Sequence, residues 1–527
     1  MKKTFLSTMA AMFAVAAFAA TANIDTTKKF QTIDSFTASD AWSGNFIGKF
    51  FDADKKEQLA KWLFSQKFGE DGSPEGIGLS LWRVNLGGGT WEQEGADIVP
   101  IQRRAESFLT KDGTKYDWSK AAGQQYFMKK AKEYGCNAFL FFSNTPPVQM
   151  TLNGKGYKDT DDFLVNLRPD KFTAFAEYLA DCAKHFADEG YNVRYISPFN
   201  EPGWKWSTNA QEGTSWGNPD IKRVSVELDR EIQKRGLNAK IFICEAERFE
   251  FLYDADSYIK NPERKSSKQR DADKPCDQIR AFFSPDSKDY IGSLKTLSRK
   301  IGAHDYHTEK TNEQIVEVRE KLAECVKKYN VEFLESEWCM LPYIENLYKK
   351  RDGKLGEMDK ALHMAKLIHT DLTTVNSCGW GYWKAFEING AHALTGVFPK
   401  NGDICQGGEI MARKKLWALG NYSFFIRPDY KRVALEGVND LDKVFASAYI
   451  SPDGEKLVVV AVNAAKQADE IKIALPDAQS VQFKKISQFR TSSSCDLAKI
   501  DEREFANAQT IKLPARSITT FVLEADK

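Results

Sequence analysis

The sequence lacks an excess of charge of either sign. Its 527 residues include 74 Lys and Arg and 73 Asp and Glu, so the net charge is +1. A balanced chain has no long-range electrostatic attraction for nucleic acid or for an anionic membrane surface. We therefore expect no nucleic-acid partner, and we expect any partner to be recognised by shape and hydrogen bonds.

Several motifs of common enzyme classes are also missing. None of the nine cysteines forms a CxxC pair, and HExxH does not occur, so a zinc site and a metallohydrolase are poorly supported. Gly87-Gly88-Gly89 is not followed by GK[ST], which favours a tight turn over a phosphate loop. We expect no metal and no other cofactor, and most cysteines are expected to be buried free thiols.

Long apolar runs are confined to the N-terminus. Lys2 and Lys3 precede an apolar stretch over 5–20, and Ala20-Thr21-Ala22 has the small residues of a cleavage site. The stretch is short for a membrane span, and no later segment is apolar enough to be one. Residues 1–22 are therefore interpreted as a signal peptide that exports the chain to the periplasm or the exterior.

Aromatic residues, in contrast, are abundant, at 12% of the chain with 12 Trp. A Trp ring offers a flat apolar face and one N–H, which suits the apolar face and hydroxylated rim of a sugar ring. The same abundance is typical of a large core, so composition alone leaves both interpretations open.

Eight short apolar runs alternate with amphipathic stretches between residues 31 and 390. Eight strands that alternate with helices indicate an α/β fold, a closed (β/α)8 TIM barrel whose strand ends form the active site. The expected helices include stretches that begin near Asp52, Asp170 and Asn312, which are plausible N-caps. The expected strands lie within 35–42, 78–88, 137–144, 193–202, 240–247, 301–307, 331–338 and 378–387.

The pattern changes after Pro428. From about 433 to 522, apolar residues alternate at period two between Gly and Asp turns, which predicts an antiparallel β-sandwich packed on the side of the barrel. We expect a signal peptide over 1–22, a catalytic barrel over 23–430 whose first residues join the side β-domain, and a sandwich over 431–527. Its aromatic residues are scattered, so the sandwich is expected to be a structural partner and not a binding module.

Two strand ends carry glutamates. Asn200-Glu201-Pro202 ends the fourth expected strand, and Glu335 and Glu337 lie two residues apart at the end of the seventh. Carboxylates on these two strands face each other across a barrel, which suits a retaining glycoside hydrolase with an acid/base and a nucleophile. Glu337 lies nearer the strand end than Glu335 and is the expected nucleophile, and Glu201 is the expected acid/base.

This pairing resembles the retaining barrel hydrolases with acid/base on strand four and nucleophile on strand seven, and among them glycoside hydrolase family 30. The likeness runs in order from 31 to 430, and SPFNEPGWKW with the later QEG is most similar to the endo-β-1,6-galactanases of that family. Two positions depart from the family pattern, since Gly203 and Thr37 stand where Gln and Gly are usual. The other segments that carry the likeness are 31–42, 79–89, 142–154, 302–307, 336–338, 379–387 and 417–430.

Supporting roles follow for strand-end residues. Arg83 is expected either to bond the nucleophile and keep it ionised or to form a structural salt bridge, and Tyr306 is placed to bond the nucleophile. Asn200 and Asn144 are candidates for bonds to sugar hydroxyls. His304 is a further strand-end candidate. Among the tryptophans the candidates for sugar stacking are Trp204, Trp206, Trp216 and Trp383, with Trp383 favoured and at least one expected in the core.

The resemblance implies an oligo- or polysaccharide substrate, most closely β-1,6-galactan of arabinogalactan side chains. Alternatives within the family are β-1,6-glucan, glucuronoxylan and small β-fucosides or β-galactosides, and a non-catalytic glycan-binding protein is the alternative of another class. A glucuronoxylan site requires a cationic pocket, and no basic cluster follows the strand-end motifs. The basic segment RKSSKQRDADK within 248–300 is interpreted as a solvated insertion.

Overall fold

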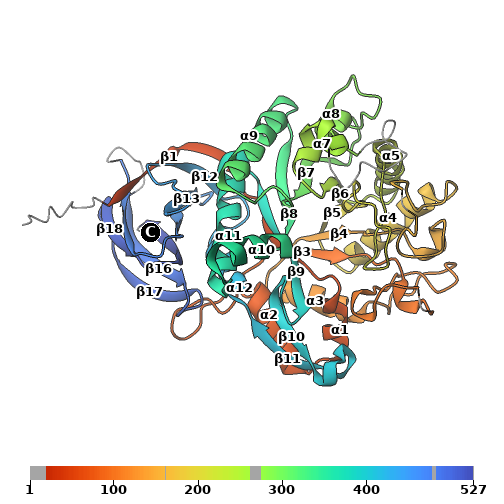
Figure 1. Ribbon diagram of the computed structural model, residues 1–527, viewed down its shortest axis with the longest axis horizontal. Coiled ribbons are helices and arrows are strands. Elements are labelled where there is room, and N and C mark those ends of the chain that lie inside the picture. The colour runs from red at the N-terminus through yellow and green to blue at the C-terminus, as the bar shows by residue number, and fades with distance from the viewer. Residues whose placement is uncertain (1–18, 96, 161, 261–274, 477–481, 526–527) are drawn as a thin grey trace, which may run out of the picture.

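The computed structural model describes residues 19–95, 97–160, 162–260, 275–476 and 482–525. It contains two parts that lie side by side, a barrel surrounded by helices and a smaller β-sandwich (Figure 1). Most of the expected signal peptide and the segment RKSSKQRDADK lie outside the described residues. The end of that signal, Ala20 to Ala22, forms the start of the first strand.

Eight parallel strands close into a barrel, because the last of them pairs with both the first and the seventh. Each lies within one of the eight expected runs or overlaps it, so the predicted (β/α)8 barrel is confirmed. The barrel strands are β2 (Ser35–Ser39), β3 (Leu81–Asn85), β4 (Phe139–Phe142), β5 (Val193–Ser197), β6 (Lys240–Ala246), β7 (Leu297–His304), β8 (Glu332–Trp338) and β9 (Gly379–Ile388).

Amphipathic helices cover the outside of the barrel, since their apolar stripes pack on the outer faces of the strands. Two strands, β10 (Ala393–Pro399) and β11 (Gly408–Ala412), extend the sheet beyond β9. The helices are α1 (Ser43–Phe50), α2 (Ala53–Phe64), α3 (Ala122–Glu133), α4 (Phe172–Asp188), α5 (Asn218–Lys234), α6 (Glu250–Tyr253), α7 (Ala255–Lys260), α8 (Gln278–Phe283), α9 (Asn312–Lys328), α10 (Pro342–Asp352), α11 (Glu357–Thr370) and α12 (Lys414–Ser423).

Two of the three expected N-caps are wrong by one residue. Asp52 does precede α2, but Lys171 and not Asp170 precedes α4. The cap of α9 is Thr311, whose hydroxyl accepts a hydrogen bond from the Gln314 N–H at 3.2 Å. Asn312 is the first helical residue. Thr311 also has a side chain that can cap a helix, and its backbone is in the extended conformation that a cap requires.

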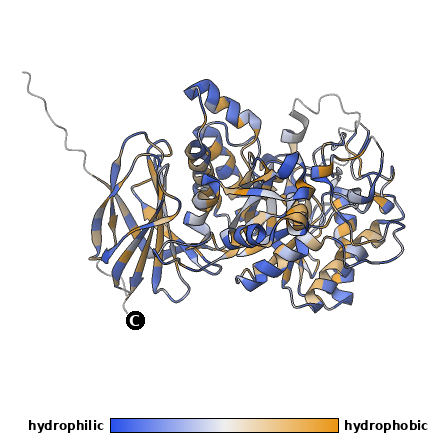
Figure 2. Ribbon diagram, turned by 90° about the horizontal axis from the view of Figure 1, so that it is seen from below, coloured by the Kyte–Doolittle hydropathy of each residue, from blue (hydrophilic) through white to orange (hydrophobic). Residues whose placement is uncertain are grey.

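Within the described residues the sandwich contains nine strands, and one of them comes from near the N-terminal end of the chain. β1 pairs antiparallel with β12 and parallel with β15, so the first described residues join the side β-domain as expected. Figure 2 shows hydrophilic and hydrophobic residues alternating along these strands. The strands are β1 (Ala20–Thr32), β12 (Lys431–Glu436), β13 (Val444–Ile450), β14 (Lys456–Asn463), β15 (Asp469–Ala474), β16 (Phe483–Thr491), β17 (Ala498–Glu504), β18 (Ala508–Leu513) and β19 (Ser517–Ala525).

One side of the sandwich joins the apolar core of the barrel, while the sandwich interior forms a second buried cluster. Phe445, Tyr449, Phe489 and Ile518 from the sandwich belong to the same buried cluster as the barrel and its helices. A continuous core of this kind fixes the sandwich against α11 and α12. All nine cysteines are free, six of them buried, and none of the described helices has the length and apolar character of a membrane span.

Candidate active site

Glu201 and Glu337 meet at the carboxyl-terminal end of the barrel strands, as the sequence predicts. Glu201 follows β5, and Glu337 is the penultimate residue of β8. One carboxylate oxygen of each lies within 4.8 Å of the other and of a ring nitrogen of His304. Retaining glycosidases hold their two carboxyl groups about 5–5.5 Å apart, so this pair has a suitable separation.

Glu335 lies deeper in the barrel and does not line the pocket. Its carboxyl oxygens accept hydrogen bonds from the backbone N–H groups of Glu337 and Gly381, both at 3.1 Å. Burial raises the pKa of Glu335 well above its usual value, and the nearby carboxylates of Asp371 and Asp305 raise it further. Glu335 therefore supports the backbone beneath Glu337, and of the two glutamates only Glu337 faces the pocket.

Arg83 and Tyr306 both contact Glu337, as expected. Arg83 Nη1 donates to Glu337 Oε2 at 2.6 Å, and the Tyr306 hydroxyl donates to Oε1 at 3.2 Å. Burial raises the pKa of Glu337, while the positive charges of His304 and Arg83 oppose that rise. Arg83 also lies 3.4 Å from Glu245, so it is at once a partner of Glu337 and part of a buried salt bridge.

His304 lies between the two facing glutamates. Its Nδ1 is 3.0 Å from Glu201 Oε1 and 3.4 Å from Glu337 Oε1, and its Nε2 is 3.0 Å from Glu245 Oε2. Burial alone would lower the pKa of His304, but the charge of Glu337 and the hydrogen bonds with Glu201 and Glu245 raise it to about 10. The ring is therefore an imidazolium at neutral pH.

Glu201, His304 and Glu337 are also close enough together to hold a metal ion. An imidazolium, however, has no lone pair to offer, because both of its nitrogens carry protons. The three side chains are better explained as a hydrogen-bonded group than as a set of metal ligands.

Glu201 has an unusual backbone for a non-glycine residue, with φ at 44°, in the left-handed region. Its carbonyl accepts hydrogen bonds from the Trp204 N–H at 2.9 Å and from the Trp206 indole N–H at 3.2 Å. These bonds hold the turn that follows Asn200-Glu201-Pro202. The side chain is thereby directed into the pocket from the end of β5.

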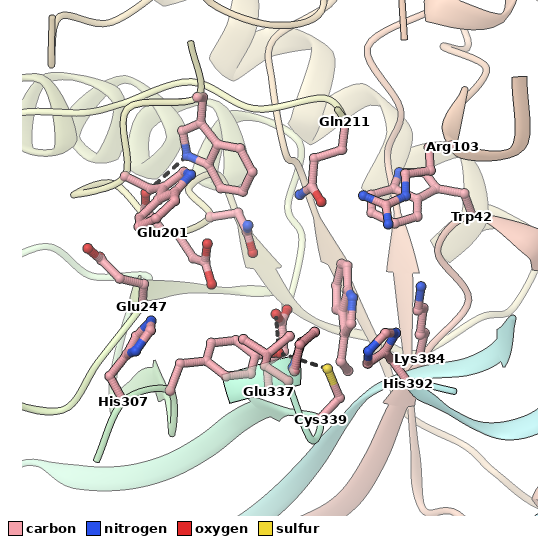
Figure 3. Close-up of a pocket in the computed structure, with 17 residues that line it drawn as sticks. Trp42, Arg103, Glu201, Gln211, Glu247, His307, Glu337, Cys339, Lys384 and His392 are labelled. Atoms are coloured by element: carbon pink, nitrogen blue, oxygen red, sulfur yellow. Dashed lines mark hydrogen bonds between the residues drawn. The ribbon is translucent and has the colours of Figure 1, made fainter. Parts of the chain in front are cut away.

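The pocket above the two glutamates has a volume of about 360 Å³ (Figure 3). Besides Glu201 and Glu337, five of the expected site residues line this pocket, namely Asn200, Trp204, Trp206, Tyr306 and Trp383. Trp204 lines the pocket and is 38% exposed, whereas Trp383 lines it and is nearly buried. Its lining residues are Trp42, Arg103, Asn200, Glu201, Trp204, Trp206, Gln211, Glu247, Tyr306, His307, Glu337, Cys339, Leu341, Pro342, Trp383, Lys384 and His392.

Four of the candidates do not line this pocket. Arg83 and His304 belong to the buried group that contacts Glu337, and the other two are Trp216 and Asn144. Trp216 is buried, with its ring stacked on Phe175 at 5.9 Å and packed edge-on against Phe199 at 5.1 Å, so it is the core tryptophan of the four. Asn144 is buried below the pocket and donates to Asn85 Oδ1 at 3.4 Å. Neither residue is placed to touch a ligand in the pocket.

The QEG motif and the glycine run belong to one structural feature. The buried carboxylate of Glu212 accepts hydrogen bonds from the Gly88 N–H at 3.0 Å and from the Thr90 hydroxyl at 2.6 Å. A side chain at Gly88 would lie 2.4 Å from Thr145, so the close approach requires glycine. Glu212 thus fixes the rim loop, while its neighbour Gln211 lines the pocket.

Residues that the sequence analysis missed form much of the pocket wall. Arg103, Lys384 and His392 gather with Trp42 at one end, and Glu247 and His307 lie toward the other (Figure 3). No basic cluster follows the strand-end motifs in the sequence, but two distant segments bring these three basic side chains together at the pocket. Gly203 lies beside Glu247, and a side chain there would meet the Glu247 carboxylate at 2.9 Å.

Known proteins match both parts of the chain. Residues 19–391 match the family model described as O-glycosyl hydrolase family 30, and residues 431–521 match its β-sandwich domain. A solved structure of a conserved exported protein from Bacteroides fragilis is 34% identical, with a TM-score of 0.84, over 95% of this chain and 100% of that one.

Characterised relatives are more distant. An endo-β-1,6-galactanase of Hypocrea rufa is 28% identical over 242 residues, which is 42% of this chain and 48% of the relative, so the match spans about half of that protein. A glucuronoxylanase of Bacillus subtilis is 23% identical over 75% of this chain and 76% of its own length. From the family matches, which cover most of its length, the chain belongs to family 30 of the O-glycosyl hydrolases.

Proposed function

We propose that Glu201 is the acid/base and Glu337 the nucleophile of a retaining glycoside hydrolase that cleaves β-1,6-linked galactan. The observation that supports the two roles is the placement of both carboxylates within 4.8 Å, one at the end of β5 and one in β8. Retention is general to enzymes with this pair of carboxylates at this separation.

In the first step Glu337 attacks the anomeric carbon while the bond from that carbon to the glycosidic oxygen breaks. Glu201 gives its proton to the departing oxygen, and a glycosyl ester forms on Glu337. Arg83 and Tyr306 position the attacking carboxylate, since both bond to it in the structure.

In the second step Glu201 accepts a proton from water, and the hydroxide formed attacks the anomeric carbon. The ester bond breaks and restores the carboxylate of Glu337. While the ester exists, Glu337 carries no charge, so Arg83 and His304 face one carboxylate fewer. The resulting positive field favours the ionised form of Glu201, which is the form that acts as base.

The direction of the substrate follows from these roles. The sugar attacked by Glu337 lies on the Trp42 side, because Glu201 must face the departing oxygen on the other side (Figure 3). The Trp383 ring packs edge-on against Trp42 at 5.4 Å, so it lies on the same side. Trp383 is the proposed stacking surface for the attacked sugar, and Trp204 with Trp206 faces the leaving group. Gly203 makes room on this leaving-group side for Glu247.

The galactan assignment rests on similarity. The SPFNEPGWKW and QEG segments resemble endo-β-1,6-galactanases, and a protein of that name from Hypocrea rufa matches over 242 residues. Arabinogalactan side chains are the natural source of β-1,6-galactan that we propose. The other class, a glycan-binding protein without activity, is disfavoured because both carboxylates and the residues that bond to them are present.

A second substrate class is favoured by the basic side chains at the end of the pocket beside Trp42. Arg103 has no carboxylate within salt-bridge distance in the described chain, and Lys384 and His392 share a single partner, Glu387. This end of the pocket suits a sugar that carries a carboxylate, such as a glucuronate. Because one of the relatives is a glucuronoxylanase, glucuronoxylan is the alternative substrate that we propose.

The cellular location and domain division are parts of the same proposal. We propose that residues 1–22 direct export and that 23–430 form the catalytic barrel, apart from β1, which pairs with strands of the sandwich. Residues 431–527 form the rest of the sandwich. The similarity to an exported protein of Bacteroides fragilis supports export.

One experiment tests the substrate. De-arabinosylated arabinogalactan, pustulan, glucuronoxylan and an aryl β-fucoside are incubated with the enzyme, and the products are separated by thin-layer chromatography. Short β-1,6-galacto-oligosaccharides are expected from the first substrate. Products from pustulan or xylan alone would overturn the galactan assignment, and tight binding without products from any glycan would favour the binding protein.

A further inference from the structure

Glu245 ends β6 and contacts the catalytic group without lining the pocket. Its Oε1 lies 3.4 Å from Arg83 Nη2, and its Oε2 lies 3.0 Å from His304 Nε2 and accepts a hydrogen bond from the Ser336 hydroxyl at 2.5 Å. The side chain is fully buried. A buried carboxylate with two cationic neighbours is retained in its charged form, and it cannot touch the substrate.

The same residue also holds the backbone of Glu201. The Glu201 N–H donates to the Glu245 carbonyl at 2.8 Å, which ties the end of β5 to the end of β6. Both residues have left-handed backbones, with φ at 44° for Glu201 and 54° for Glu245. Non-glycine residues occupy this region at a cost of about 1 kcal/mol or more, and they persist there only where surrounding contacts hold them.

The contact between Glu245 and His304 decides the state of the imidazole. One ring nitrogen faces Glu245 and the other faces Glu201 and Glu337, so each nitrogen has a carboxyl oxygen as its neighbour. Carboxylates only accept hydrogen bonds, and an imidazole that donates from both nitrogens is positively charged. While Glu245 and Glu337 are both ionised, each ring nitrogen faces a carboxylate, and this geometry favours the protonated ring.

We propose that Glu245 is a positioning residue that holds His304 as an imidazolium and thereby keeps Glu337 ionised beneath the substrate. This inference rests on the proposed role of Glu337 as nucleophile. Arg83 and His304 supply two positive charges, and Glu245 and Glu337 supply two negative charges, so the buried group is neutral while Glu201 carries its proton. Formation of the glycosyl ester removes one negative charge and leaves the group positive.

The charged and titratable groups that face His304 come from every neighbouring strand end. They are Arg83 from β3, Glu201 after β5, Glu245 from β6, Tyr306 after β7 and Glu337 from β8. Burial raises the pKa of Glu337, and after burial the opposing charge of His304 is the largest influence, greater than that of Glu245. Loss of the His304 charge and loss of the Glu245 charge therefore move the pKa of Glu337 in opposite directions.

Glu245→Gln separates these two effects. If Glu245 holds the proton on His304, the variant loses both charges, the pKa of Glu337 rises, and the acidic limb of the kcat/KM profile moves up by about one pH unit. If His304 stays protonated without Glu245, only a negative charge is lost, and the limb moves down. A downward shift or an unmoved limb would overturn the inference. Glu470→Gln, which removes an exposed carboxylate of the sandwich, is the control and should leave the limb in place.

A second measurement needs no activity and compares the wild type with the same variant. Nitrogen NMR of His304 in the wild type should show both ring nitrogens protonated from about pH 6 to 9, and in Glu245→Gln the ring should titrate within that range. A neutral His304 at pH 7 in the wild type would overturn the inference. Ordinary turnover by Glu337→Gln would instead overturn the proposed nucleophile and would leave the NMR result unchanged, so the two failures are distinguishable.

Discussion

Arg83 Nη1 lies 2.6 Å from Oε2 of Glu337, and both side chains are almost completely shielded from solvent. The guanidinium also reaches Glu245 at 3.4 Å and Asn200 Oδ1 at 3.3 Å. A planar group with several donors in a fixed arrangement bridges these three neighbours at once, and a lysine ammonium does not have that geometry.

Arg83→Lys should therefore reduce kcat/KM strongly although it retains the positive charge. We expect a loss of about 100-fold in kcat/KM, because a lysine cannot contact Glu337, Asn200 and Glu245 at the same time and the Glu337 carboxylate is then less well positioned. Arg83→Gln should lose more and should also raise the pKa of Glu337, which moves the acidic limb of the pH profile upward. Steady-state kinetics across pH would check both effects. Wild-type kinetics in Arg83→Lys would show that the charge alone is sufficient.

The two proposed catalytic glutamates should fail in different ways. Glu201→Gln should nearly abolish hydrolysis of natural glycans, yet it should still form the glycosyl-enzyme from aryl glycosides, whose leaving groups need little protonation. Glu337→Gln should abolish both reactions. Mass spectrometry of the trapped intermediate and NMR of the first product distinguish the cases. An inverted anomeric configuration would exclude the two-step mechanism, and turnover by Glu337→Gln would reassign the nucleophile.

Most residues of the catalytic group could be predicted from the sequence, because strand ends are short and regular. Glu201, Glu337, Arg83, His304 and Tyr306 all follow apolar runs, and in a barrel such positions converge. The fold followed from the same runs, since eight of them alternate with helices. The sequence does not predict which side chains a strand-end residue contacts. For this reason it leaves two interpretations of Arg83 open, a structural salt bridge and a hydrogen bond to the nucleophile.

The pocket walls were not predictable in the same way. Arg103 comes from a loop without periodicity, and Trp216 and Trp383 look alike in sequence although one is core and the other faces the pocket. The loops fold according to contacts between distant segments, such as that of Glu212 with Gly88. Local sequence patterns contain no information about such contacts, so the cationic end of the pocket was missed.

That cationic end gives a substrate prediction. Arg103→Gln should reduce kcat/KM for a galacto-oligosaccharide that ends in glucuronate by about 5-fold, and it should leave the methyl ester of the same substrate almost unaffected, since one exposed ion pair contributes about 1 kcal/mol. Comparison of the acid with its ester in both enzymes isolates the charge. Equal effects on acid and ester would show that Arg103 contributes packing against Trp42 and not charge recognition.

Glu212 gives a prediction for stability and pH. Burial raises the pKa of this carboxyl to about 7, although the Thr90 hydroxyl and the Gly88 N–H oppose the rise. Because the folded pKa lies above the unfolded value of 4.5, the contribution of this group to stability is present below about pH 4.5 and is lost as the pH rises through 7.

Glu212→Gln removes this titration and retains an acceptor for Gly88. The difference in melting temperature, variant minus wild type, should therefore increase as the pH rises from about 4.5 to 8. Glu470→Gln, on an exposed position of β15, is the control and should give a constant difference. A difference that is constant for Glu212→Gln as well would show that the buried carboxyl does not titrate in this range.

The last prediction concerns the sandwich. Expression of residues 23–430 alone should give insoluble or unstable protein, because the sandwich covers a face of α11 and α12 with apolar side chains from the shared core. The truncation also leaves β1 without both of its partner strands, β12 and β15.

Polar contacts across the same boundary are lost with it. The side chain of Asn421 in α12 donates to the Thr491 hydroxyl at 2.6 Å, and the backbone carbonyl of Asn421 accepts from the Thr520 hydroxyl at 2.7 Å. The truncation therefore exposes buried polar groups as well as apolar surface. Solubility, melting temperature and activity of the truncated chain check this. A soluble and fully active 23–430 would mean that the barrel core closes without the sandwich, and the sandwich would then need another role.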